Sequence, residues 1–143
     1  MDPRLALLGT WRLVSWEMRS ASGRVWPAGF DDGYLMYTPD GYMSVVLTKE
    51  PRARFDNDSR ERGTVDEKVR AFDSYISYGG SYVVDGDIVT HQVRFCLFPN
   101  VVGTSQLRRF AINPESTTLT LWTVDPLVMQ GEKAYGCLTW RRA

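Results

Sequence analysis

Apolar and polar residues alternate with a period of two along most of the chain, which is the spacing of β-strands. The alternating segments are rich in aromatic and β-branched residues and are separated by short stretches containing Gly, Pro, Asn or Asp. This pattern predicts eight strands, mostly joined as hairpins, over residues 8–19, 34–37, 42–47, two within 81–98, 105–112, 118–124 and 134–140.

One segment has a different period and predicts a helix over residues 65–77. Thr64 and Glu67 have the spacing of a capping box, which marks a helix N-terminus. The residues that follow place an apolar stripe on one side, formed by Val65, Val69, Phe72 and Ile76. The highly charged segment just before it, 48–63, is expected to be a loop, and we consider it a candidate lid.

Eight sequential antiparallel strands favour an all-β, up-and-down barrel, because closure removes the unpaired edges of the sheet. The amphipathic helix is then expected to pack outside the barrel, and a β-sandwich is the alternative. An eight-stranded barrel has an interior that side chains fill or that holds one small ligand. A length of 143 residues fits a single domain, 1–143.

Composition narrows the classes of function. The net charge is zero and no basic stripe is present, which argues against nucleic-acid binding. The short apolar run near the N-terminus lacks the features of a signal peptide, and no segment is long enough to span a membrane. Two distant cysteines, Cys96 and Cys137, fit free thiols in a reducing compartment, so we expect a cytoplasmic protein. A single histidine and the absence of nucleotide-binding motifs predict no metal and no cofactor.

Several motifs together resemble a known family. "GTWRLVS", "GYLMYTPDGYMSVVL", "YGGSYVVDGDIVTH", "PNVVGTSQLRRF" and "LTWRR" occur in order along nearly the whole chain. They are similar to the lipocalin-like domain family of small bacterial and fungal proteins. The resemblance implies a calycin-type barrel with a pocket for a small, largely apolar molecule. It also implies that Trp11 closes one end of the barrel and that Arg141 or Arg142 packs across it.

The first strand then has a defined direction. If Trp11 faces inward, regular alternation places Leu13, Ser15 and Glu17 on the inner wall. Trp16 is then expected to face outward, where the amphipathic helix would cover it.

Three titratable residues are candidates for chemistry. His91 shares a strand face with Val89 and Val93, so we expect it to line the interior, either as a proton-transfer group or as a structural histidine with one buried partner. Glu17 is a candidate base if the strand still borders the pocket there, and a solvated carboxylate if it does not. One of Arg108 and Arg109 points inward if their strand is regular, and the family resemblance favours Arg108, paired with Glu17, with a ligand oxygen or in a structural tie.

A second group of residues is expected to form an apolar wall with a few hydroxyl groups, suited to an aromatic or polyketide-like guest, although each also fits ordinary core packing. These residues are Tyr34, Met36, Tyr42, Ser44, Val93, Phe95, Phe110 and Trp122. Alternation leaves the direction of Trp122 open.

These residues support three hypotheses. The first is a cofactor-free cyclase or isomerase that folds a hydrophobic natural-product intermediate, polyketide- or terpenoid-like, into a reactive conformation. The second is a non-catalytic carrier or sensor of a hydrophobic ligand that uses the same pocket. The third is an interaction module with a filled barrel. The expected partner is a hydrophobic small molecule, and a homodimer is compatible with the sequence.

Overall fold

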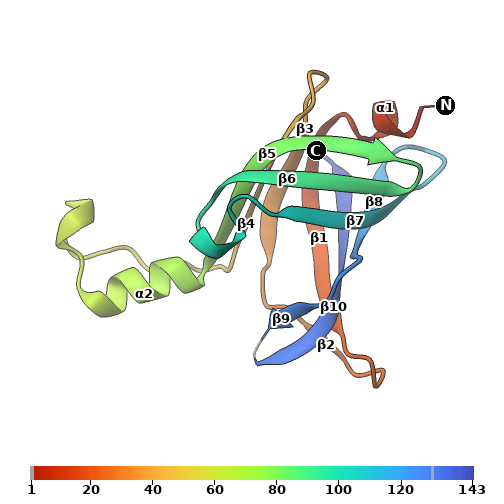
Figure 1. Cartoon of the computed structure of the whole chain (residues 1–143). Coiled ribbons are helices and arrows are strands. Elements are labelled where there is room, and N and C mark those ends of the chain that lie inside the picture. The colour runs from red at the N-terminus through yellow and green to blue at the C-terminus, as the bar shows by residue number, and fades with distance from the viewer. Residues whose placement is uncertain (1, 130) are drawn as a thin grey trace.

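The fold is a closed antiparallel β-barrel, as the sequence predicts (Figure 1). The computed structural model describes residues 2–129 and 131–143. Each barrel strand pairs with its neighbour in the chain, and pairing of the first strand with the last closes the sheet. The eight barrel strands are β1 (Gly9–Arg19), β3 (Asp32–Tyr37), β4 (Tyr42–Thr48), β5 (Tyr75–Asp85), β6 (Ile88–Cys96), β7 (Ser105–Ile112), β8 (Thr118–Thr123) and β10 (Glu132–Arg142).

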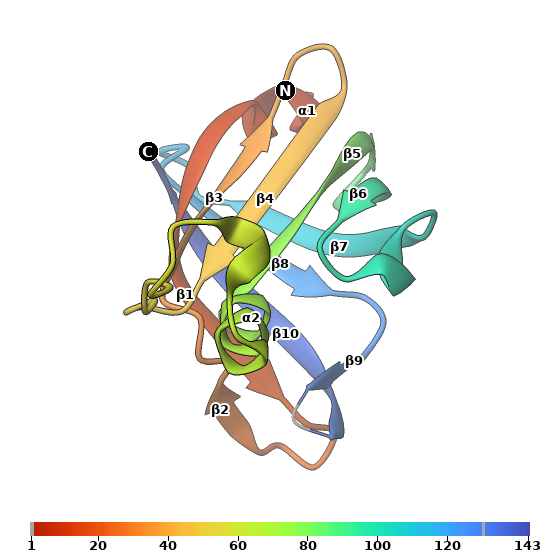
Figure 2. The ribbon, with the colours of Figure 1, turned by 90° about the vertical axis from the view of Figure 1, so that its left-hand side faces the viewer.

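Two short strands lie where the sequence pattern indicated only loops. β2 (Val25–Pro27) pairs with the end of β1, and β9 (Leu127–Met129) pairs with the start of β10. They extend these two long strands beyond the barrel wall at one end of the molecule (Figures 1 and 2). A short 3₁₀ helix, η2 (Pro99–Val101), connects β6 to β7.

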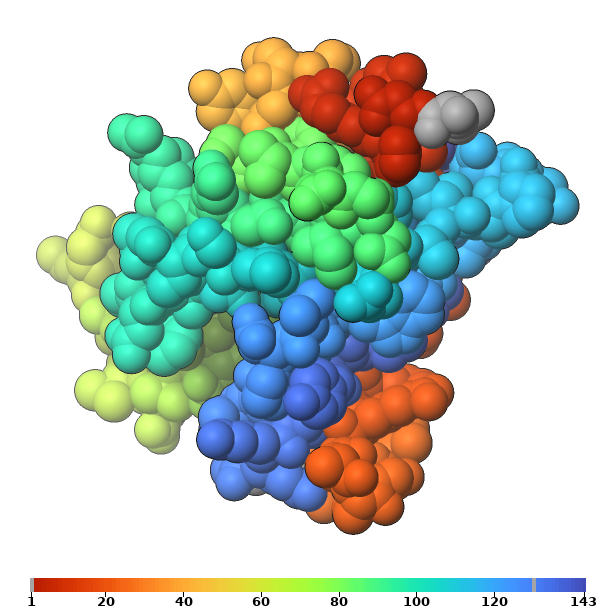
Figure 3. Space-filling model, turned by 45° about the vertical axis from the view of Figure 1, so that its right-hand side comes forward, coloured from red at the N-terminus to blue at the C-terminus, as the bar shows by residue number. Residues whose placement is uncertain are grey.

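The opposite end of the barrel is closed by a helix that the sequence analysis did not predict. α1 (Pro3–Leu7) begins at Asp2, whose side chain accepts a hydrogen bond from the Arg4 amide. Leu7 is fully buried, and its carbonyl accepts a hydrogen bond of 2.9 Å from the Trp11 indole. α1 also lies against the β3–β4 turn, where Arg4 donates to the Pro39 carbonyl (Figure 3).

Arg142 completes this closed end. Its guanidinium lies 3.9 Å from the centre of the Trp11 ring and donates to the carbonyls of Leu8, Ala6 and Ser116. The expectation that a late arginine packs across Trp11 is therefore confirmed. Arg142 rather than its neighbour takes this place, because Arg141 is exposed on the other face of β10.

The predicted helix exists outside the barrel but is shorter and less covered than expected. α2 (Val65–Asp73) has the capping box at Thr64 and Glu67, but the chain from Tyr75 onward is β5. Its apolar face is largely exposed, with Val65 78% exposed, and it does not cover Trp16. Together with the preceding loop and η1 (Arg60–Arg62), α2 forms an arm, residues 49–73, that projects from the barrel (Figures 1 and 2).

A bulge in β1 reverses the expected directions of its second half. The register with β10 shifts between Leu13 and Ser15, which inserts one residue and changes which side chains face inward. Trp11 and Leu13 face inward as expected, but beyond the bulge Trp16 and Met18 are the buried residues and Glu17 is exposed. The inward Glu17 and outward Trp16 of the sequence analysis are both wrong.

Candidate functional site

A cavity of about 550 Å³ occupies the barrel at the end away from α1. Its wall is mainly apolar and draws on strands from all sides of the barrel, including Leu35, Val45, Leu47, Leu121, Leu138 and Trp140. A second hollow, at the base of α2, shares Ile76, Cys96, Phe98 and Met129 with it, so these residues form the mouth of the cavity. A large, mainly apolar hollow with few polar groups is typical of a small-molecule site.

The polar part of the cavity wall centres on His91. His91 is 1% exposed, and both of its ring nitrogens have tyrosine partners. Nε2 lies 2.7 Å from the Tyr37 hydroxyl, and Nδ1 lies 2.6 Å from the Tyr78 hydroxyl. Tyr37 is buried in the core, whereas Tyr78 and His91 both line the cavity. The three side chains come from β3, β5 and β6, so the barrel has to close before they meet.

Burial keeps this cluster neutral. Desolvation, with a smaller contribution from the positive charge of Arg108, lowers the pKa of His91 to about 3. Desolvation also raises the pKa of Tyr78 and holds the pKa of Tyr37 well above its ordinary value. His91 is therefore a neutral imidazole, and both tyrosines keep their protons, across the ordinary pH range.

Arg108 lies on the cavity wall, as expected, with its charge close enough to affect His91 and Tyr78. Its Nη1 donates to the Leu107 carbonyl over 3.0 Å. Among residues 2–129 and 131–143, no carboxylate lies within ion-pair distance of it. Arginine carries five donors and no acceptor, and the one hydrogen bond of Arg108 within the described residues uses one of them, so its other donors have no partner there.

Glu17 does not reach this cluster. Its exposed side chain lies 3.8 Å from Arg19 on the outside of β1, so it neither lines the cavity nor pairs with Arg108. The bulge described above is the reason. The structure brings together His91 and Arg108, but not the third candidate for chemistry.

Four residues of the β3–β4 hairpin face the opposite way from the prediction. Tyr34, Met36, Tyr42 and Ser44 are exposed on the outer surface, with Tyr42 58% exposed. The inner face is formed by the residues between them: Leu35, Tyr37, Met43, Val45 and Leu47. Both faces of this hairpin carry large apolar residues, so alternation alone did not tell them apart.

The other four expected wall residues also lie outside the cavity lining. Val93 and Phe110 face inward and are buried, in agreement with the expected inward direction, but they do not border the cavity. Trp122 is partly exposed, because the inward positions of β8 are Leu121 and Thr123.

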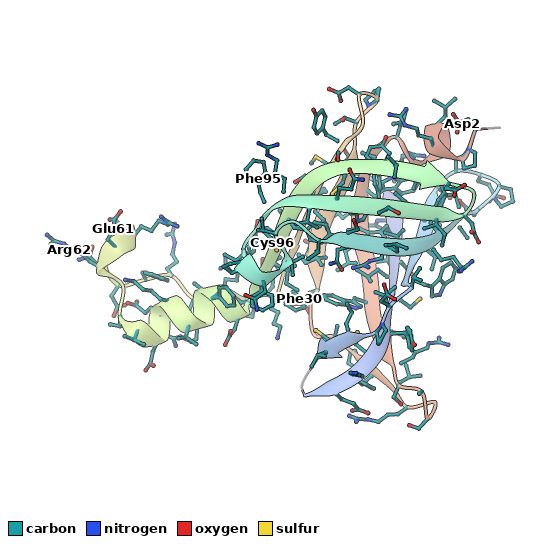
Figure 4. The ribbon with its side chains drawn as sticks, viewed as in Figure 1. Asp2, Phe30, Glu61, Arg62, Phe95 and Cys96 are labelled. Carbon is teal, nitrogen blue, oxygen red and sulfur yellow. The ribbon has the colours of Figure 1, made fainter. Side chains whose placement is uncertain are left out.

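Phe95 points outward because β6 also contains an irregularity. Gly79 pairs with Phe95 and Gly80 with Val93, so Arg94 is an extra residue and the inward direction passes to Cys96. Phe95 is 68% exposed, whereas Cys96 lines the cavity mouth (Figure 4). The expected inward Phe95 is thus wrong.

The most informative residues that sequence reasoning missed are Tyr78, Tyr37 and Cys96. Tyr78 falls in "YISYGG", which the helical pattern assigned to the end of the helix, although it lies within β5. A signal was present, because Tyr75, Tyr78 and Tyr82 flank β-branched residues and two glycines in a segment suited to a strand. The closeness of Tyr37 to His91, 54 residues apart, had no signal in one sequence.

The fold and the cavity together define a small β-barrel protein of the ligand-binding type. The lipocalin-like domain family matches residues 8–143, and the chain belongs to this family. It is 33% identical over 108 residues to the 4′-hydroxy-3′-methoxypropiophenone carrier protein of Aspergillus oryzae, a match that covers 70% of this chain and 96% of the relative. A solved lipocalin-like protein from Bacteroides uniformis aligns with a TM-score of 0.49 and 13% identity, over 96% of this chain and 99% of that one.

No helix among the described residues is long and apolar enough to cross a membrane. The same residues contain no group of three or more His, Cys, Asp or Glu side chains placed to hold a metal ion.

Proposed function

We propose that this protein binds and carries a small, mainly apolar molecule inside the barrel. The observation that carries the proposal is the cavity of about 550 Å³, with its apolar wall and a polar cluster confined to one part of it. Apolar walls supply most of the affinity of such a site, and a few fixed polar groups orient the guest. The filled-barrel interaction module is not supported, because the interior contains this space.

The named relative supports a particular class of guest. That protein is named as a carrier of an aryl ketone with hydroxyl and methoxy groups. A molecule of this kind has an apolar ring and a few oxygen atoms, which matches a mainly apolar cavity with tyrosine, histidine and arginine in its wall. We extend this class, a small oxygenated aromatic molecule of natural-product type, to the present chain as a proposal.

The state of His91 favours a carrier. A general base needs a free lone pair directed at the substrate and a pKa near the working pH. Both ring nitrogens of His91 are engaged by tyrosines, and its pKa lies at about 3. His91 therefore fits a positioning role better than the proton-transfer role considered from the sequence.

A cofactor-free isomerase or cyclase is the second candidate, and Arg108 is the observation that favours it. Its guanidinium lines the cavity without a carboxylate partner among the described residues. A fixed cation beside a reacting carbonyl stabilises the negative charge that develops on the carbonyl oxygen. In this version Arg108 is the catalytic residue, and Tyr78 assists it.

The two free cysteines bear on where the protein works. Cys96 and Cys137 are unpaired, and Cys96 lies at the cavity mouth. Free thiols are kept reduced in the cytosol, so we propose a cytoplasmic carrier.

Native mass spectrometry with a panel of aromatic ketones, polyketides, terpenoids and fatty acids tests the proposal. The key variant is Cys96→Trp, which fills the cavity mouth, and its matched control is Phe95→Trp, one residue away on the outer surface. We expect a guest that binds wild type and Phe95→Trp but binds Cys96→Trp at least about tenfold more weakly, since an indole there occludes the space that the ring of the guest needs. Equal loss or equal retention in both variants would contradict binding in the cavity.

The recovered guest separates the two candidates. A guest that returns with unchanged mass and unchanged chromatographic retention supports a carrier. A guest of unchanged mass and altered retention, formed by wild type and not by Arg108→Met, supports an isomerase or cyclase.

A further inference from the structure

Tyr37, His91 and Tyr78 form a hydrogen-bonded chain that runs from the core to the cavity. Tyr37 is 2% exposed, and among the described residues its hydroxyl has one hydrogen-bond partner, Nε2 of His91. Tyr78 lies at the other end of the chain and lines the cavity. Its hydroxyl likewise has one partner within the described part of the chain, Nδ1 of His91.

The direction of the protons along this chain follows from the number of donors and acceptors. A neutral imidazole has one N–H donor and one lone-pair acceptor. The Tyr37 proton is buried, and a buried donor left without an acceptor costs about 1–3 kcal/mol. Its one available acceptor is Nε2, so Tyr37 donates to Nε2, and the imidazole proton is on Nδ1.

The consequence falls on Tyr78. Nδ1–H donates to the Tyr78 oxygen, so Tyr78 acts as the acceptor in its bond with His91. Its own O–H proton then has no acceptor among the described residues and is available on the cavity side. Arg108, on the same wall, also has only donors to offer. This part of the cavity therefore presents donors from two side chains.

We propose that Tyr78 donates a hydrogen bond to a carbonyl-type oxygen of the guest, with Arg108 as a second donor beside it. The proposal deepens the proposed function and rests on it, because it names the polar group that the carried molecule must have. Sites built to hydrogen-bond a particular group discriminate strongly against analogues that lack it, since the buried donor is then left unpaired. Aromatic ketones therefore suit this site better than hydrocarbons of the same shape.

The proton direction is tested without any guest. His91 is the single histidine of the chain, so ¹⁵N NMR of protein prepared without a histidine tag reports on it alone. We expect a protonated, pyrrole-type Nδ1 and an unprotonated, pyridine-type Nε2. The opposite tautomer would make Tyr78 the donor to His91 and would overturn the proposal, while leaving ligand binding in the cavity intact.

The specificity is tested with two probes of one skeleton, propiophenone and propylbenzene, which differ in the carbonyl oxygen. We expect wild type to bind propiophenone about tenfold or more tightly than propylbenzene, measured by calorimetry, since this corresponds to one well-placed hydrogen bond. Tyr78→Phe should lose most of that preference, with any remainder coming from Arg108, and should keep its affinity for propylbenzene. Tyr42→Phe, which removes a hydroxyl from the outer surface, should behave as wild type.

The outcomes of this experiment distinguish the Tyr78 proposal from the carrier proposal. Equal binding of both probes by wild type, or a ketone preference that is undiminished in Tyr78→Phe, overturns the Tyr78 proposal and leaves the carrier proposal standing. Binding of neither probe overturns both for this class of molecule. The carbonyl stretch of bound propiophenone gives a second reading: a shift to lower frequency in wild type that is absent in Tyr78→Phe supports a direct hydrogen bond.

Discussion

The two ends of the barrel are built in different ways. At the closed end, α1, Trp11 and Arg142 fill the interior, and their polar atoms are paired with one another and with backbone carbonyls. Toward the open end the barrel contains a cavity that is bordered by Trp16 and, deeper inside, by Trp140, and the indole nitrogens of both are buried without a hydrogen-bond partner among the described residues.

This difference separates an end of the barrel that is packed for stability from an end that leaves space for a guest. Full packing and paired polar groups at one end stabilise the sheet and fix its closure. Incomplete packing at the other end leaves space that a guest is able to fill, and it leaves buried donors unpaired, at some cost in stability. We therefore expect the proposed binding to take place at the end that contributes less to stability.

The largest expected effect compares the two tryptophans of β1. Trp11→Ala should lower the free energy of unfolding by about 3–5 kcal/mol, because it leaves a large void and removes the support of Arg142. Trp16→Ala should cost at least about 1 kcal/mol less, because Trp16 already borders a cavity and its indole nitrogen has no partner within the described residues. Urea unfolding measures both, and equal losses would contradict the contrast between the ends.

The next effect depends on pH and concerns His91 in the cavity wall. The pKa of His91 is about 3 in the folded protein and about 6.5 in the unfolded chain, so below pH 6.5 the unfolded state takes up a proton that the folded state does not. The contribution of neutral His91 to the free energy of unfolding is fully present above pH 6.5, and it falls by up to about 1.4 kcal/mol per pH unit as the pH decreases toward 3. The free energy of unfolding should thus be about 2 kcal/mol lower at pH 5 than at pH 8.

His91→Gln provides the control for this pH dependence. Glutamine keeps an acceptor and a donor near the two tyrosines but does not titrate. Its stability should change much less than that of wild type between pH 8 and pH 5, where most carboxylates remain ionised. The same slope in both proteins would show that His91 is not the group responsible.

The smallest effect is expected in the arm, which contributes little to either end. Val65→Ser should change the free energy of unfolding by less than about 0.5 kcal/mol, because Val65 is 78% exposed. A loss above 1 kcal/mol in Val65→Ser would mean that the exposed face of α2 is covered in solution, for instance by a second copy.

Limited proteolysis should cleave residues 49–63 before any barrel strand, since that segment has few buried contacts. Slower cleavage with a bound guest would support the lid considered from the sequence, and equal cleavage would contradict it.

The sequence alone determined much of the local structure of this protein. Strand and turn residues fixed the hairpins, Thr64 and Glu67 fixed the start of α2, and the number of strands indicated a closed barrel. These features depend on neighbours in the chain, so their physical causes are present in short stretches. The family resemblance added the contact between Trp11 and an arginine, which the structure assigns to Arg142.

Only the tertiary structure decided which side chains reach the cavity. A strand has a side-chain period of two, so a single inserted residue moves every following side chain to the other face. This happens in β1 before Glu17 and in β6 before Phe95, and neither bulge has a marker such as proline in the sequence. The partners of His91 likewise come from strands distant in the chain, Tyr37 in β3 and Tyr78 in β5. Register and barrel closure, which are collective properties of the whole sheet, therefore determined the site.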